Sequence, residues 1–155
     1  MTQIRGRHSR TAALGITLAL TVLASPRALA RDTVHKLSFA ELLASPDAKE
    51  RLDPAIQFFL AGASTPPVSQ RGAEFVTNRK TNGVGKADAV ACRWAALAAL
   101  IQLQERAREA GMNAVVDITS FYKRNTFSSP TEYECHAGGV VVGVTLKGTI
   151  ATVQR

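Results

Sequence analysis

A long helix followed directly by a strand sets the architecture of this chain. Residues 88–110 place apolar side chains, Cys92 and Leu100 among them, along one side of a helical wheel, while glutamate, glutamine and arginine gather on the opposite side. Gly111 stands where a helix end favours positive φ, and the apolar, β-branched run at 113–118 is too short to continue the helix. The sequence therefore predicts a helix with one buried side, a tight turn and a strand.

Shorter elements surround this unit. Strands are predicted at 33–37, 55–60, 73–77 and 131–137, short helices at 39–43 and 46–52, an exposed loop at 61–72 and a polar connection at 78–86. The last part of the chain is expected to form three or four antiparallel strands, in which Gly143 and Gly148 mark bulges or close backbone approach. The fold class is α+β, a small, mainly antiparallel sheet packed on one long helix and braced by one disulfide, with its core within 73–155.

The first thirty residues are typical of an export signal. They combine three basic residues (Arg5, Arg7 and Arg10), an uncharged apolar run at 12–23 and an A-x-A cleavage site at 28–30. Because a bilayer span needs about 20 apolar residues, a cleaved signal peptide is favoured over the alternative, an N-terminal membrane anchor. Residues 1–30 are therefore predicted to be removed on export to the periplasm, which leaves a single domain over 31–155 with no membrane anchor.

Export also changes the charge of the chain. The whole sequence has a net charge of +7, but loss of the four arginines of the signal leaves 15 Lys and Arg against 12 Asp and Glu, a net charge of +3. Such a small, scattered excess does not favour nucleic acid as a partner. The basic pairs Arg79-Lys80 and Lys123-Arg124 are predicted to lie in loops, where an acidic partner could touch them.

The two cysteines, Cys92 and Cys135, lie 43 positions apart. An oxidising compartment favours a disulfide between them, and the alternative is a free catalytic thiol. The period of two along the strand at 131–137 places Tyr133, Cys135 and Ala137 on the face toward the helix. The predicted bridge therefore crosses the core.

The opposite face of this strand carries Glu132, Glu134 and His136. Carboxylates and an imidazole on one face can bind a divalent metal ion, although a defined site needs three or four converging ligands, and the distant His35 is the one further candidate. The alternative is an ordinary solvated strand face. No cofactor is expected.

Other motifs give little support for catalysis. Gly83-Val84-Gly85-Lys86 resembles the end of a phosphate-binding loop, but Lys80 stands at its first glycine position and Ala87 at its hydroxyl position. His35 and His136 are candidate bases, yet no serine or threonine stands at a catalytic spacing.

Several remaining side chains are assigned structural places. Asp117 alternates with apolar neighbours and is predicted to point outward from its strand, whereas Trp94 and Phe58-Phe59 are predicted to pack in the core.

Two family resemblances rest on longer stretches. The patterns LQERAREAGMNAVVDITSFYK and TEYECHAGGVVVGVTLKG resemble small exported proteobacterial proteins that carry the label excinuclease ATPase subunit. That label implies a DNA-repair ATPase, but this chain lacks the phosphate-binding loop and C-x-x-C zinc pairs, and it is too short for a tandem ATPase. The stretch at 107–116, with the strand pair after it, is similar to the YbjQ-like heavy-metal-binding family and to the stress-sensing lipoprotein of the Rcs phosphorelay. This second resemblance implies a small α+β domain that contacts other envelope proteins.

These features together predict a non-enzymatic, disulfide-braced periplasmic binding domain. Envelope stress sensing or protein interaction is its expected role, and an envelope protein or a small ligand is its expected partner. A divalent metal-binding protein is the alternative. An enzyme is less expected, and an excinuclease-type ATPase least of all.

Overall fold

A computed structural model describes residues 31–154 of the chain. The predicted signal peptide and its cleavage site lie outside these residues. The described elements are, in chain order, β1 (Thr33–Ser38), α1 (Phe39–Ala44), α2 (Pro46–Arg51), β2 (Gln57–Leu60), β3 (Val68–Asn82), α3 (Asp88–Glu109), β4 (Ala114–Ser120), the short 3₁₀ helix η1 (Tyr122–Arg124), β5 (Glu132–Ala137) and β6 (Val141–Val153). None of these helices has the length and apolar composition that a bilayer-spanning helix requires.

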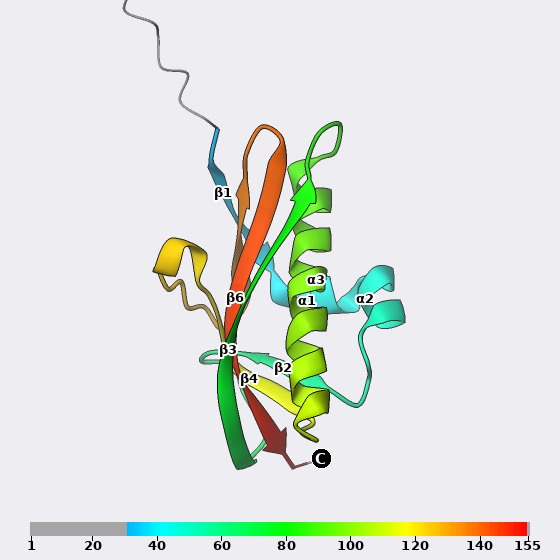
Figure 1. The fold of residues 1–155 in the computed structure, drawn as a ribbon, viewed down its shortest axis with the longest axis vertical. Coiled ribbons are helices and arrows are strands. Elements are labelled where there is room, and N and C mark those ends of the chain that lie inside the picture. Colours follow the sequence, from blue (N-terminus) through cyan, green and yellow to red (C-terminus); the bar gives the residue numbers. More distant parts are fainter. Residues whose placement is uncertain (1–30, 155) are drawn as a thin grey trace, which may run out of the picture.

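The described strands form one sheet in the order β1-β5-β6-β4-β2, and β3 pairs with the other edge of β6. The pairing is antiparallel throughout except between β2 and β4. Helix α3 covers one face of the sheet, which we call the inner face, and η1 lies on the opposite, outer face (Figure 1). Gly111, with a φ of +66°, ends the turn from α3 into β4 as predicted. The structure thus confirms the α+β class with a mainly antiparallel sheet on one long helix.

Helix α3 forms the centre of the core. Its buried residues are mostly alanine and leucine: Ala91, Cys92, Ala95, Ala96, Leu97, Ala99, Leu100, Leu103, Gln104 and Ala107. The small alanines allow the helix to lie close to the sheet, while the leucines fill the space between them and contribute most of the apolar area removed from water. Gln104 is the polar member, and its Oε1 accepts a hydrogen bond from the Asp53 amide at 2.6 Å. Phe58 belongs to the same core, as predicted, and Trp94 packs against it partly buried, whereas Phe59 packs against a smaller second cluster. The core also includes Phe39 and Leu42, so it is not confined to 73–155 as predicted.

Strand β3 corrects the prediction for the middle of the chain. The sequence indicated a loop at 61–72, a short strand at 73–77 and a polar connection at 78–86, whereas one continuous strand runs over Val68–Asn82. Most of its side chains are exposed, because β3 is an edge strand that pairs only with β6 and covers little of the core. An edge strand with this exposure has no apolar alternation to reveal it. Arg79-Lys80 therefore lies on a strand, not in a loop.

Strand β4 bends at a β-bulge that the sequence placed only in part. Asp117 has a φ of +53° and is exposed, as predicted, with its Oδ2 at 2.5 Å from Arg71 Nη1. Gly148 lies opposite the bulge, where an added Cβ would come within 2.8 Å of Val115 Cγ1. The predicted close approach at Gly148 is thereby confirmed.

The stability of the fold is expected to depend on pH in the alkaline range because Tyr133 is buried in the core. Burial raises the pKa of its hydroxyl from 10.0 to about 12, with nearby Arg93 opposing the shift and Glu41 adding to it. Because the folded state holds this proton more tightly than the unfolded state, the protonated hydroxyl stabilises the fold. This contribution to the free energy of unfolding is complete below pH 10 and is lost as the pH rises from 10 to 12.

Between pH 10 and 12 we expect the free energy of unfolding of the wild type to fall by about 2 kcal/mol more than that of the Tyr133→Phe variant, which has no hydroxyl to ionise. Urea unfolding of both proteins at a series of pH values measures the difference. Parallel stability curves for the two proteins would contradict the assignment.

Candidate functional site

The residue types singled out in the sequence meet in a cavity of about 320 Å³ on the outer face of the sheet, beside η1. Its polar and charged walls are Arg31, Asp32, Asn78, Lys80, Lys123 and His136. Strand register explains part of this gathering, because His136 of β5 is paired with Gly143 of β6, and Gly143 is paired with Lys80 of β3. Cross-strand partners point to the same face of a sheet, so the imidazole and the lysine stand on either side of a glycine.

Gly143 forms the floor of the cavity. An added Cβ would lie 3.6 Å from Lys80 Cγ and 3.7 Å from the Arg79 carbonyl oxygen, which are ordinary van der Waals distances. The prediction of a bulge or close backbone approach at this glycine was therefore wrong, since the register of β6 with β3 continues without a shift here. The missing side chain leaves open space above the sheet.

His136 is the most buried polar group of the cavity. Its imidazole stacks on the Tyr122 ring, with ring centres 3.5 Å apart and planes inclined by 16°. Nδ1 lies 3.2 Å from Asp32 Oδ1, and the side chain is only 12% exposed. Nε2 is buried and makes no hydrogen bond within residues 31–154. Buried polar atoms are rarely left without a partner, so this nitrogen is an exception among the polar atoms near the cavity.

The cavity carries an excess of positive charge. Lys123 Nζ lies 3.5 Å from Asp32 Oδ2, and Arg31 forms an ion pair with Asp88 at the start of α3. Lys80 has no ion-pair partner in the described part of the chain. Lys123 thus pairs with Asp32 and Arg31 pairs with Asp88, while the lysine on β3 is free to pair with an anion.

Backbone strain accompanies this charge. Lys123 and Arg124 have φ values of 50° and 66°, so two consecutive residues with side chains adopt the left-handed conformation. Such residues cost about 1 to 3 kcal/mol each and persist where the surrounding structure holds them. Here the segment is closed by the Asn125 amide, which donates to the Tyr122 carbonyl at 2.9 Å, and it carries Tyr122 and Lys123 to the cavity.

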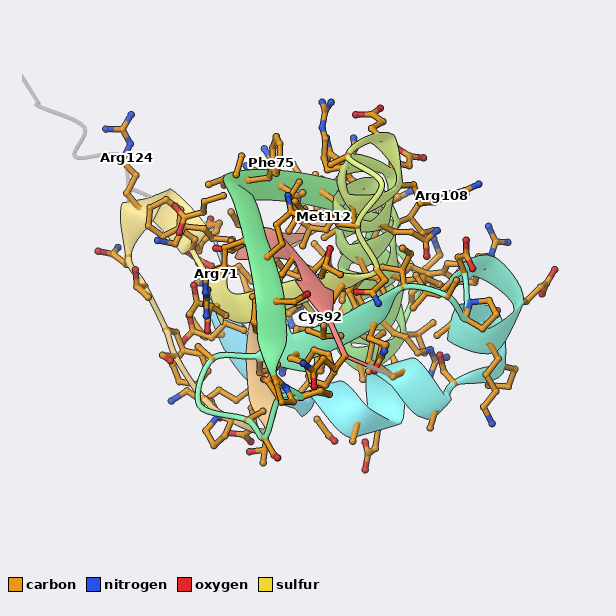
Figure 2. The ribbon with its side chains drawn as sticks, turned by 90° about the horizontal axis from the view of Figure 1, so that it is seen from below. Arg71, Phe75, Cys92, Arg108, Met112 and Arg124 are labelled. Atoms are coloured by element: carbon orange, nitrogen blue, oxygen red, sulfur yellow. A yellow bond between two sulfur atoms is a disulfide. The ribbon has the colours of Figure 1, made fainter. Side chains whose placement is uncertain are left out.

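Arg124, the last residue of η1, lies on the side of the molecule opposite Arg108 of α3 (Figure 2).

The candidate metal residues are placed as the alternation predicted but do not converge. Glu132, Glu134 and His136 share the outer face of β5, while His35 lies on the inner face, where its Nε2 is 2.9 Å from Asp88 Oδ2. Residues 31–154 contain no group of three His, Cys, Asp or Glu side chains arranged to hold a metal ion. His136 instead contacts Asp32 and Tyr122.

The predicted disulfide between Cys92 and Cys135 is present. The two Cα atoms are 5.7 Å apart, and both cysteines are completely buried. The bridge joins the first turns of α3 to β5, so it fixes the strand that carries His136 to the main helix. No free thiol is left for the alternative of catalysis.

The two sequence patterns that carry the family resemblances include much of this cavity. The first ends at Tyr122 and Lys123, and the second contains His136 and Gly143. Lys80 and Asp32 lie outside both patterns. No family model, curated protein or solved structure matches this chain, so both resemblances stay predictions.

Proposed function

We propose that this chain is a non-enzymatic, exported binding domain that holds an anionic ligand in the cavity beside η1. One observation carries the proposal: Lys80, Lys123 and Arg31, from three separate segments, line one cavity around the buried imidazole of His136. The disulfide supports an oxidising compartment, because such bridges persist there and are rare in the cytosol. The periplasm is the compartment that we propose.

The chemistry of the lining favours a small oxyanion. Lysine ammonium groups are hydrogen-bond donors to phosphate or carboxylate oxygens, and charge-assisted bonds of this kind are about twice as strong as neutral ones. Lys80 gives up no ion pair within the described residues when it binds such a ligand. Asp32 limits the positive charge of the site, and its Oδ1 lies 3.2 Å from His136 Nδ1, which orients the imidazole.

Inorganic phosphate is the simplest probe. We expect it to raise the melting temperature of the protein by mass action, and we expect the Lys80→Ala variant to bind it at least about tenfold more weakly. Calorimetric titration in a phosphate-free buffer at low ionic strength measures both affinities. Lys49→Ala, which removes the same charge from α2, is the control and should bind like the wild type.

A variant that fills the cavity without changing the charge distinguishes binding in the cavity from general attraction of anions by the positively charged protein. Gly143→Val should abolish phosphate binding because its γ-methyl groups occupy the cavity, whereas Gly143→Ala, whose Cβ fits at ordinary distances, should weaken binding less. Both should stay folded, since the side chains extend away from the core. Equal phosphate affinity for the wild type and Gly143→Val would sink the proposal.

A further inference from the structure

The exposed apolar residues of the protein gather around the cationic cavity. Six valines are the large apolar residues that are exposed in the described chain: Val34, Val76, Val84, Val90, Val140 and Val141. Four of them lie at the cavity end of the sheet. Val34 is paired with His136, Val141 lines the cavity, and Val140 and Val84 follow on the adjoining loops.

Two loop tips carry the outermost members of this group. The connection from β3 to α3 holds Val84, and the connection from β5 to β6 holds Val140, which is 62% exposed. These connections lie side by side at the same end of the molecule (Figure 1), joined by a hydrogen bond of 2.8 Å from the Gly83 amide to the Val140 carbonyl. The two valines therefore form one small apolar tip.

A second hollow connects this tip to the cationic cavity. It has a volume of about 380 Å³ and lies between Val84, Val140 and Val141, with Lys80 at its inner end. Lys80 and Val141 line both the hollow and the cavity. Along β3 and β6 the order from the tip inward is thus apolar side chains first and cations second.

We propose that this end of the protein docks on an anionic lipid surface, with the phosphate of a lipid headgroup in the cavity and the valine tip in the membrane interface. The inference deepens the proposed function and rests on it, because it names the source of the anion. The order of groups carries it: a bilayer approached from water presents phosphates first and hydrocarbon below them, so the protruding valines reach deeper than Lys80. A freely soluble phosphate would make no use of the exposed valines.

The interaction is expected to be weak and reversible. Two valines bury little area, and each lysine or arginine near an anionic surface strengthens binding only about fivefold. Binding should therefore require anionic lipid and should fall with added salt, because the attraction is screened over about 10 Å at 0.1 M ionic strength.

Co-sedimentation with vesicles tests this inference on the oxidised protein secreted to the periplasm. Vesicles of phosphatidylglycerol and phosphatidylcholine in equal amounts should bind the wild type, and vesicles of phosphatidylcholine alone should not. Val84→Ser/Val140→Ser should bind the anionic vesicles about tenfold more weakly. Val76→Ser removes a valine that is 52% exposed elsewhere on β3, and it should bind like the wild type.

Soluble glycerol phosphate distinguishes the two levels of the proposal. The Val84→Ser/Val140→Ser variant should bind it with wild-type affinity, because the cavity is intact, while Lys80→Ala should lose both glycerol phosphate and vesicles. Wild-type vesicle binding by the valine variant, or equal binding to both vesicle types, would overturn the docking inference and leave the anion site standing. Failure of the wild type to bind glycerol phosphate would overturn the anion site itself.

Discussion

The Cys92→Ala/Cys135→Ala variant is expected to be about 4 kcal/mol less stable than the oxidised protein. The bridge closes a loop of 43 positions, and the chain-entropy relation assigns about 4 kcal/mol to a loop of this length. Both cysteines are completely buried between α3 and β5, so the alanine variant also loses packing at the centre of the core. For a single domain of this size, such a loss is a large part of the total stability.

Urea unfolding of the oxidised protein, the reduced protein and the double variant measures this effect. A reducing agent should lower the midpoint of the wild type toward that of the double variant and should leave the double variant unchanged. A midpoint that is the same for the oxidised protein and the double variant would show that the bridge contributes nothing to stability.

Leu100→Ala is expected to lower the free energy of unfolding by about 3 kcal/mol. Leu100 lies in the middle of α3 and has no exposed surface, so its removal leaves a cavity that the surrounding sheet cannot fill. Val90→Ala, near the exposed start of the same helix, is the matched control and should change stability by less than about 0.5 kcal/mol. Denaturant unfolding of both variants measures the difference, and equal effects would mean that α3 packs differently from the arrangement described above.

Local sequence patterns predicted the helices and strands that bury one face and expose the other. The apolar side of α3 and the alternation along β5 follow from the periods of 3.6 and 2, and together they placed Cys92 and Cys135 on facing surfaces. Gly111 and Gly148 were also informative, because their positions demand a positive φ or a close approach. Strand β3 escaped prediction because an edge strand with mostly exposed side chains carries no such pattern.

The cavity could be predicted only as separate residues. Lys80, Lys123 and His136 each stood out by type, but Lys80 meets His136 only through the register of β5, β6 and β3, which non-local pairing fixes. Lys123 reaches them from η1. The left-handed backbone at Lys123 and Arg124 gave no signal either, since neither residue type favours that conformation. Asp32 and Tyr122, which hold the imidazole, could be recognised only once His136 was placed between them.

The bridge from α3 to β5 also constrains how the chain matures. With two cysteines in the sequence, oxidation within one molecule has a single possible product, so folding needs an oxidant but no isomerase to correct a wrong pairing. Cys135 lies on a strand that is synthesised after the helix, so the thiol of Cys92 stays unpaired until β5 has been made and has packed against α3. The wrong pairing between copies of this chain is an intermolecular disulfide that gives a covalent dimer. Its formation depends on protein concentration, so dilution suppresses it.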